Sequence, residues 1–300
     1  MRVLLALITL ALSVSAMAET YLLPSPTDDL VGQMFTVNAS ASDTLPDLAR
    51  THDVGFDSIV RANPSVDPWL PGVGTAVDVP TWHILPDAPR KGIVLNLAEL
   101  KLYFYPHPMP GIRPLVMIFP VGIGRMDWAT PLGVTQIIAR IPHPVWYPPT
   151  SIRDEHGADG DPLPLKVEAG PNNPLGEYAI QLGIPGYFLH GTNRPYGVGM
   201  RVSHGCVRLY PEDISLLFHQ VARGTQVRII NEPYKAGWHD GKLFIEVHPL
   251  PPEGDSQDIS LTPIVRLIIK ATSHRPTRVD WKKVTNVATE ARGIPVAVSY

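Results

Sequence analysis

Two short runs decide the chemistry and the fold of this chain: His190-Gly191-Thr192 and, after a bridging loop, Ser203-His204-Gly205-Cys206-Val207-Arg208. Cys206 is the only cysteine among 300 residues. A thiol becomes a strong nucleophile when it ionises, and a neighbouring imidazole can hold the thiolate and later protonate a leaving amine. Glycine lets the backbone turn sharply and brings N–H groups close to a developing oxyanion. The stretch therefore predicts acyl transfer by Cys206, with the N–H groups of Gly205 and Cys206 as oxyanion donors.

The same residues allow a plainer interpretation, because a lone cysteine is often only a small buried hydrophobic residue. The glycine turns and the two histidines around Cys206 favour the catalytic one. The base must then be a histidine, and there are two candidates. His190 comes from a separate predicted strand and can face the sulfur, whereas His204 is only two residues away and is constrained by the loop.

The two runs resemble the catalytic signature of the L,D-transpeptidases, the YkuD-type domain. Further matches lie upstream, at Gly122-x-Gly124, Thr130-Pro131-x-Gly133 and Pro174-Leu175-Gly176. The resemblance covers residues 92 to 231, which we expect to form the catalytic domain. It implies a mainly β fold of the L,D-transpeptidase type, a β-sandwich with one or few helices.

The resemblance also assigns roles. It implies that His190 is the proton acceptor, oriented by the backbone carbonyl of Gly191 and not by a carboxylate. Ser203 and His204 would then support the site or contact the substrate. Arg208 could grip a carboxylate bidentately or serve as a structural hydrogen bonder. No cofactor and no metal are expected, and no H-x-x-x-H or C-x-x-C spacing occurs.

The implied substrate is a peptidoglycan stem tetrapeptide. Cys206 would attack the carbonyl of the third, diamino acid residue and release D-Ala. The acyl group would pass to an amine, either of a second stem peptide or of a lysine in an envelope lipoprotein. Water as the acceptor would make the protein an L,D-carboxypeptidase, and a catalytically inactive peptidoglycan-binding scaffold is the alternative from another class.

Composition limits the remaining classes of function. Three hundred residues suggest two or three domains, and 33 prolines without a period indicate a loop-rich globular protein. The net charge of −3 argues against a strongly basic nucleic-acid binder.

The first 18 residues have the pattern of a cleaved signal peptide. Arg2 supplies the positive charge, Val3 to Val14 is almost wholly apolar, and Ala16-Met17-Ala18 has the small residues of a cleavage site. This apolar run is too short to span a bilayer. We therefore expect a protein exported to the periplasm, without a transmembrane segment.

Residues 34 to 80 predict a small unit of β-α-α-β order. Strands are expected at 35–37 and 76–79, and helices from Asp43 to about His52 and after the cap residue Gly55. This order resembles a LysM module, which implies binding of N-acetylglucosamine-containing glycan strands. Ser42 stands where that family commonly has glycine, and a purely structural packing role is the alternative. Residues 81 to 91, rich in proline, are predicted to be a linker.

Period-two patterns predict the strands of the catalytic domain, at 93–97, 102–105, 115–121, 135–141, 177–182, 187–190 and 226–230. An amphipathic helix is expected from Pro211 to Ala222, with Gly224 as its C-terminal cap. Repeated prolines between 142 and 176 predict a long loop. Trp146 and Tyr147 within it either line a substrate groove or pack in the core.

Residues 232 to 300 form a predicted C-terminal α+β extension. A strand is expected at 242–248, and helices at 261–271 and 281–292. The part from Tyr234 to Pro251 resembles the extension of the LysM-bearing, enterobacterial-type members of the family. No chemistry can be assigned to it.

Overall fold

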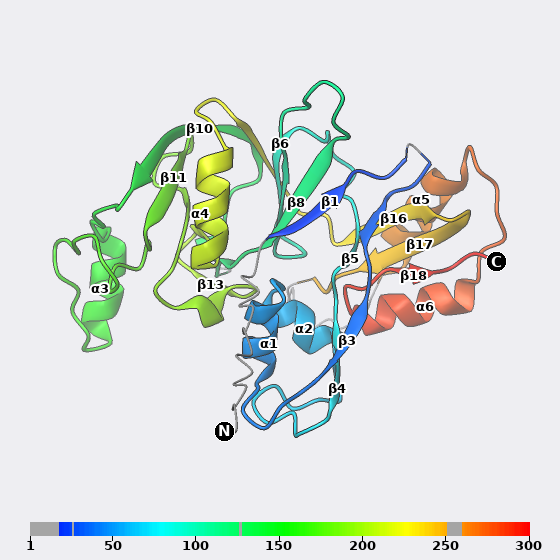
Figure 1. Cartoon of the computed structure of the whole chain (residues 1–300), viewed down its shortest axis with the longest axis horizontal. Helices are drawn as coiled ribbons and strands as arrows, with labels where there is room; N and C mark the ends of the chain where they lie inside the picture. The colour runs from blue at the N-terminus through cyan, green and yellow to red at the C-terminus, as the bar shows by residue number, and fades with distance from the viewer. Residues whose placement is uncertain (1–17, 26, 126–127, 251–259) are drawn as a thin grey trace, which may run out of the picture.

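A computed structural model describes residues 18–25, 27–125, 128–250 and 260–300 (Figure 1). The predicted signal peptide therefore lies outside the described residues, except for Ala18. Within these ranges, no helix has the length and apolar character that crossing a membrane requires.

A large curled sheet forms the middle of the molecule and confirms the predicted mainly β fold. In spatial order its nine described strands are β1 (Glu19–Leu22), β8 (Leu115–Pro120), β7 (Lys101–Tyr105), β6 (Gly92–Asn96), β15 (Gln226–Ile230), β10 (Gly133–Pro142), β11 (Tyr178–Leu182), β12 (Phe188–His190) and β14 (Val207–Arg208). Most neighbouring strands are antiparallel, but β6–β15 and β12–β14 are parallel.

One helix, α4 (Pro211–Gln220), packs against this sheet beside β11 (Figure 1). Its residues Ile214, Leu217 and Phe218 are buried in the same core cluster as the sheet's inner side chains. Pro211 fits the first turn because its missing N–H would have no partner there. The helix ends two residues earlier than predicted, at Gln220 and not at Ala222, and its C-terminal cap is Val221 and not Gly224.

The predicted β-α-α-β unit comprises β3 (Phe35–Asn38), α1 (Leu45–Thr51), α2 (Phe56–Ala62) and β4 (Ala76–Val79). Gly55 caps α2 as expected, but Thr44 and not Asp43 caps α1. The Asp47 N–H donates to Thr44 Oγ1, and the Thr44 N–H donates to the Asp47 carboxylate, each at 3.2 Å. This reciprocal capping box satisfies two donors at once. Asp43 instead accepts from the Ser40 N–H.

Two stretches that the sequence predicts to be irregular contain regular structure. The proline-rich region includes α3 (Thr150–Ala158), which occupies a run without proline directly after Pro149. The predicted linker includes β5 (Trp82–Ile84), which pairs with β2 (Leu30–Gly32). Both predictions are wrong at these residues, because proline spacing alone hides short elements that tertiary pairing stabilises.

The C-terminal extension has the predicted α+β character. Its sheet contains β16 (Tyr234–His239), β17 (Lys242–Val247) and β18 (Val296–Ala297), of which only β17 was expected. The helices α5 (Thr262–Thr272) and α6 (Trp281–Glu290) bury Ile264, Ile268, Val284 and Val287 in one core cluster with this sheet.

The β-α-α-β unit contacts the catalytic domain through backbone atoms. The Phe56 N–H donates to the Val198 carbonyl and the Asp57 N–H to the Gly199 carbonyl, each at 3.2 Å. A Cβ added at Gly199 would lie 2.4 Å from the Gly55 Cα. The two segments of the chain can therefore approach this closely only because both positions are glycine. The contact follows the short helix η2 (Pro195–Gly197) in the loop that leads to the cysteine motif.

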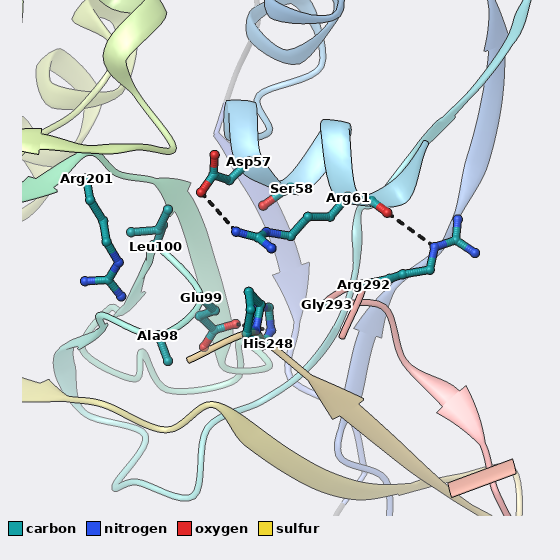
Figure 2. A pocket seen from close by; sticks show the side chains of 11 residues that line it. Asp57, Ser58, Arg61, Ala98, Glu99, Leu100, Arg201, His248, Arg292 and Gly293 are labelled. Carbon is teal, nitrogen blue, oxygen red and sulfur yellow. Dashed lines mark hydrogen bonds and ion pairs between the residues drawn. The ribbon is translucent and has the colours of Figure 1, made fainter. Parts of the chain in front are cut away.

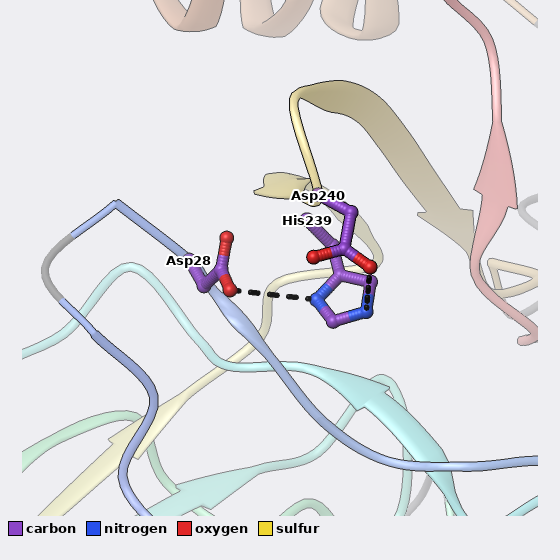
Figure 3. A group of neighbouring side chains, drawn as sticks. All are labelled: Asp28, His239 and Asp240. Carbon is purple, nitrogen blue, oxygen red and sulfur yellow. Dashed lines mark ion pairs between the residues drawn. The ribbon is translucent and has the colours of Figure 1, made fainter.

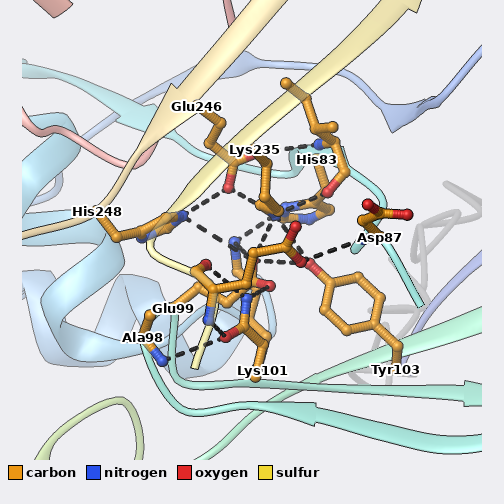
Figure 4. Close-up of polar contacts among 12 residues, drawn as sticks. His83, Asp87, Ala98, Glu99, Lys101, Tyr103, Lys235, Glu246 and His248 are labelled. Atoms are coloured by element: carbon orange, nitrogen blue, oxygen red, sulfur yellow. Dashed lines mark hydrogen bonds and ion pairs between the residues drawn. The ribbon is translucent and has the colours of Figure 1, made fainter. Parts of the chain in front are cut away.

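A buried polar cluster joins the catalytic domain to the C-terminal extension (Figure 4). The Lys235 ammonium lies 2.7 Å from Glu99 Oε2 and 2.9 Å from Glu246 Oε1, and it also donates to the Ile84 carbonyl. Burial disfavours the charged ammonium, but the two carboxylates outweigh burial and raise the pKa of Lys235. Lys235 is therefore the nearest counter-charge of this junction, and the buried Lys101 ammonium lies farther away, 3.9 Å from Glu99 Oε2.

Replacing Lys235 with methionine should destabilise the protein by about 3–5 kcal/mol, because it leaves the buried Glu246 without its paired ammonium and Glu99 with only the more distant Lys101. Urea unfolding would measure the loss. Lys270→Met is the matched control, since that ammonium pairs with Asp87 at an exposed position and should cost less than about 1 kcal/mol. Equal losses in the two variants would contradict this account of the cluster.

Candidate active site

The parallel pairing of β12 and β14 brings the two sequence motifs together. Its register places Leu189 opposite Val207 and His190 opposite Arg208. Leu189 and Val207 are buried in the core. Because successive side chains of a strand alternate, His190 and Arg208 share the opposite face. Cys206 directly precedes β14, and the Arg208 charge affects the pKa of both Cys206 and His190, so both groups lie near the same guanidinium.

The imidazole of His190 is buried and oriented by its own backbone neighbour. Its Nδ1 lies 2.6 Å from the Gly191 carbonyl oxygen. A carbonyl only accepts, so Nδ1 carries the hydrogen and the Nε2 lone pair is free. Burial and the nearby Arg208 charge lower the pKa of His190 to about 3, despite the opposing Gly191 contact. The ring is therefore neutral at pH 7.

The thiol of Cys206 is half-buried, and its Sγ lies 3.5 Å from the Gly186 carbonyl oxygen. Burial raises its pKa, and this outweighs the opposing effects of the Phe188 backbone and the Arg208 charge. Both shifts favour the uncharged forms, a thiol at Cys206 and a neutral imidazole at His190. The direction is opposite to the resting thiolate expected from the sequence, and its physical cause is the cost of burying a charge.

Two hydroxyl groups hold the loop that carries Cys206. Ser203 Oγ donates to the Cys206 carbonyl at 2.5 Å, and Thr130 Oγ1 donates to the Gly205 carbonyl at 2.8 Å. In a trans peptide the N–H points away from the C=O, so the Cys206 N–H points away from Thr130. Gly205 has a φ of +99°, and a Cβ on Gly124 would lie 2.8 Å from the Gly205 Cα. The upstream motifs therefore pack directly against the cysteine loop.

His204 is occupied by a different network. Its Nε2 lies 2.9 Å from Glu155 Oε2 in α3, and Arg125 donates to Glu155 Oε1 at 2.8 Å. The Trp128 ring meets the His204 imidazole edge-on at 5.3 Å between centroids. The contacts with Arg125 and then His204 lower the pKa of Glu155. His204 thus ties the cysteine loop to α3.

Sequence reasoning did not identify Glu155, Arg125 or Trp128. Trp128 lies two residues before the Thr130-Pro131 motif, and this closeness could have marked it as a residue of the site. Glu155 is about 50 positions from His204, and no local pattern marks it.

The structure does not bring Trp146 and Tyr147 into contact with the cysteine motif. Trp146 forms a backbone bridge with Val167, and Tyr147 is exposed. Among the described contacts, neither side chain touches Cys206, His190 or His204. Their role in substrate binding stays a prediction.

Two groups of described side chains have the spacing of metal ligands. In the first group, Glu99 and Glu246 already pair with the Lys235 ammonium, so a cation occupies that centre, and His248 Nε2 lies 2.7 Å from Glu246 Oε1. Asp28, His239 and Asp240 lie at the surface, where His239 pairs with Asp28 at 3.7 Å and with Asp240 at 3.6 Å (Figure 3). Nothing in either arrangement requires a metal.

A small cavity lies where the β-α-α-β unit, the catalytic domain and the C-terminal extension meet (Figure 2). Its volume is about 40 Å³, and its lining includes Asp57, Arg61, Arg201 and Arg292. The aspartate pairs with Arg61, and Arg201 and Arg292 donate to backbone carbonyls. The space accepts about one water molecule and no substrate.

Residues 90–229 match the family model of the L,D-transpeptidase catalytic domain. The chain belongs to the L,D-transpeptidase family. It is 40% identical to "Probable L,D-transpeptidase YcfS" of Escherichia coli strain K12, over 96% of this chain and 91% of that protein. It is 39% identical to "Probable L,D-transpeptidase ErfK/SrfK" of Salmonella typhimurium strain LT2, over 95% of this chain and 92% of that protein.

A solved relative is the catalytic domain of the Enterococcus faecium L,D-transpeptidase, determined by NMR. It is 19% identical, covers 48% of this chain and all of that one, and aligns with a TM-score of 0.36.

Alkylation of Cys206 by iodoacetamide should accelerate as the pH rises, with a midpoint above that of an exposed cysteine, because burial favours the neutral thiol. Arg208→Gln should move the midpoint higher still, since the Arg208 charge lowers the thiol pKa. Arg223→Gln, at an exposed position, is the control and should leave it unchanged. A midpoint below 7 would instead indicate a resting thiolate.

Glu155→Gln should release α3 from the cysteine loop, because it removes the charge shared by His204 and Arg125. Trypsin cleavage after Arg153 should then become faster than in the parent chain. Asp154→Asn alters the neighbouring exposed carboxylate and should leave the cleavage rate as it was. Equal rates in the Glu155 variant and the parent would show that the contact does not restrain α3.

Proposed function

We propose that the protein is a cysteine-dependent L,D-transpeptidase of peptidoglycan. The observation that carries the proposal is the β12–β14 register, which pairs His190 with Arg208 and so brings the strand that Cys206 precedes beside the strand that ends at His190. Family membership supports the reaction class, and the names of the relatives agree with it.

The proposed reaction begins with the neutral pair. His190 Nε2 takes the thiol proton as Cys206 Sγ attacks the carbonyl carbon of the stem peptide's diamino acid residue. Charge therefore develops only when substrate is present. The N–H groups of Gly205 and Cys206 donate to the oxyanion. The intermediate then collapses, the bond to D-Ala breaks, and His190 returns its proton to the departing amine, leaving a thioester.

The second half of the reaction reverses the proton flow. An acceptor amine attacks the thioester, His190 removes a proton from it, and the Cys206 thiol is regenerated. A second stem peptide as acceptor gives a cross-link, whereas a lysine of an envelope lipoprotein gives an anchored protein. Water as acceptor gives the carboxypeptidase reaction.

Arg208 is proposed to bind a substrate carboxylate. Its Nε is buried, and within the described part of the chain it has no hydrogen-bond partner. A buried donor without an acceptor costs free energy, which a carboxylate oxygen would recover. The Arg208 charge acts on the Cys206 thiol, so the bound carboxylate would lie beside the attacked bond.

The accompanying parts fit an envelope enzyme. The β-α-α-β unit is proposed to act as a LysM-like glycan-binding module, with the exposed Trp69 and Leu70 beside its second helix. We propose export to the periplasm with cleavage after Ala18. Both features would bring Cys206 to stem peptides on glycan strands.

Cys206→Ala should abolish D-Ala release from a disaccharide-tetrapeptide, because no other thiol exists in the chain. His190→Ala should lower the rate by at least about 100-fold, the usual contribution of a general base. His204→Ala should lower it less, since that ring contacts Glu155. Mass spectrometry of the products, with and without a lysine-ending acceptor peptide, distinguishes amine transfer from hydrolysis.

Circular dichroism of each variant serves as the folding control. Full activity of Cys206→Ala would refute the assignment, and a larger loss in His204→Ala than in His190→Ala would reassign the base. An unmodified Cys206 and unchanged substrate in the parent chain would favour the inactive scaffold.

A further inference from the structure

Three carboxyl groups meet inside the molecule, away from the cysteine motif. They come from Glu19 at the start of β1, Asp53 between α1 and α2, and Asp213 in the first turn of α4. Asp53 is 5% exposed and Asp213 is 1% exposed. Asp53 and Asp213 interact directly through their carboxyl groups. The cluster therefore joins strand β1, the β-α-α-β unit and helix α4.

Within the described residues, no cationic side chain forms an ion pair with Asp53 or Asp213. Asp213 Oδ2 is buried, and none of the described residues offers it a hydrogen bond. Burial first, and then neighbouring carboxylates, raise the pKa of Asp213 well above its ordinary value. Burial likewise raises the pKa of Asp53 to about 7 and that of Glu19 to about 8.

The other charged and titratable groups around the cluster are committed elsewhere. Arg50 pairs with Glu212 at 3.0 Å, and the Tyr210 hydroxyl donates to the Val54 carbonyl. On the far side, the Glu19 carboxylate is contacted by Tyr21 and His83 and is influenced by Lys101.

The backbone nitrogen of Glu19 points at this cluster. Its N–H donates to Asp53 Oδ2 at 3.2 Å, and Ala18 before it is 5% exposed and packs in the core of the catalytic domain. The Ala18–Glu19 peptide bond is also the one that follows the predicted cleavage motif. The peptide bond to be cleaved therefore lies beside the carboxyl groups of Asp53 and Asp213, which have no cationic partner among the described side chains.

We propose that the Asp53–Asp213 cluster is a binding site for the α-ammonium group that processing creates on Glu19. The inference rests on the proposed cleavage after Ala18. A signal peptidase adds water across the peptide bond: the C–N bond breaks, oxygen goes to the Ala18 carbonyl carbon as a carboxylate, and the protons leave Glu19 with an ammonium group. One amide donor is replaced by a cation with three N–H donors.

The ammonium group explains the unpartnered oxygen. It keeps the contact with Asp53 and has donors left for Asp213, in the space that Ala18 vacates. Asp213 lies in α4, whose Ile214 packs against Gly191, and the Leu209 N–H donates to the His190 carbonyl just before the helix. Cleavage before Glu19 therefore stabilises α4, the helix that supports the catalytic loop.

Two purified chains test the site directly: one beginning at Glu19 with a free amine, and one beginning at Ser15. At pH 7 the Glu19 chain should melt at least about 3 °C higher. A free α-amine has a pKa of about 7.7–8.0, and carboxylates raise it in the folded state. The advantage should therefore disappear as the pH rises toward about 10 and the amine loses its proton, and it should also disappear in acid, where Asp53 and Asp213 are protonated in both chains. Hydrogen exchange of residues 209–220 should be slower in the Glu19 chain.

Asp213→Asn should abolish the difference between the two chains, and Asp53→Asn does the same if the first variant fails to fold. Asp57→Asn is the matched control on α2, where the carboxylate pairs with Arg61, and it should preserve the difference. Equal melting temperatures and exchange rates in the two parent chains would overturn the proposal and show that the aspartates share a proton instead. Mass spectrometry of the exported protein tests cleavage separately, and a first residue other than Glu19 would also overturn it.

Discussion

The parallel pairing of β12 with β14 is the constraint on which the proposed site depends. It is only two residues long on the β14 side, so its own ladder is short. Neighbouring bonds extend it: the Leu209 N–H donates to the His190 carbonyl, and Gly122 and Arg208 exchange two backbone hydrogen bonds at 2.8 Å. The remaining support comes from side chains, with Ser203 holding the cysteine carbonyl.

Charge is distributed unevenly around this edge. On the buried side, His190 and Cys206 are both neutral at rest, because desolvation dominates each. On the outer side, His204, Glu155 and Arg125 form an ionic network with α3. The two histidines of the motif thus differ in environment more than in sequence. That difference, and not proximity to the cysteine, separates a potential base from an anchor.

The sequence predicted most of the regular elements, because they follow strong local rules. Alternating apolar residues located the central strands, and the 3.6-residue period located α4. Elements that depend on distant partners were missed. Strand β1 exists because it pairs with β8 nearly 100 residues later, and β5 exists because it pairs with β2. The carboxylate cluster around Asp53 was also invisible, since its three members are far apart in the chain.

The backbone contact between Gly55 and Gly199 has a geometric consequence. The two backbones meet here without intervening side chains, so a side chain at either glycine would force the β-α-α-β unit and the loop before the cysteine apart. Any long polymer held by the small unit would be presented to the catalytic edge along one direction and at one spacing. The two glycines therefore set the spacing between the small unit and the catalytic edge, and substituting either would change that spacing.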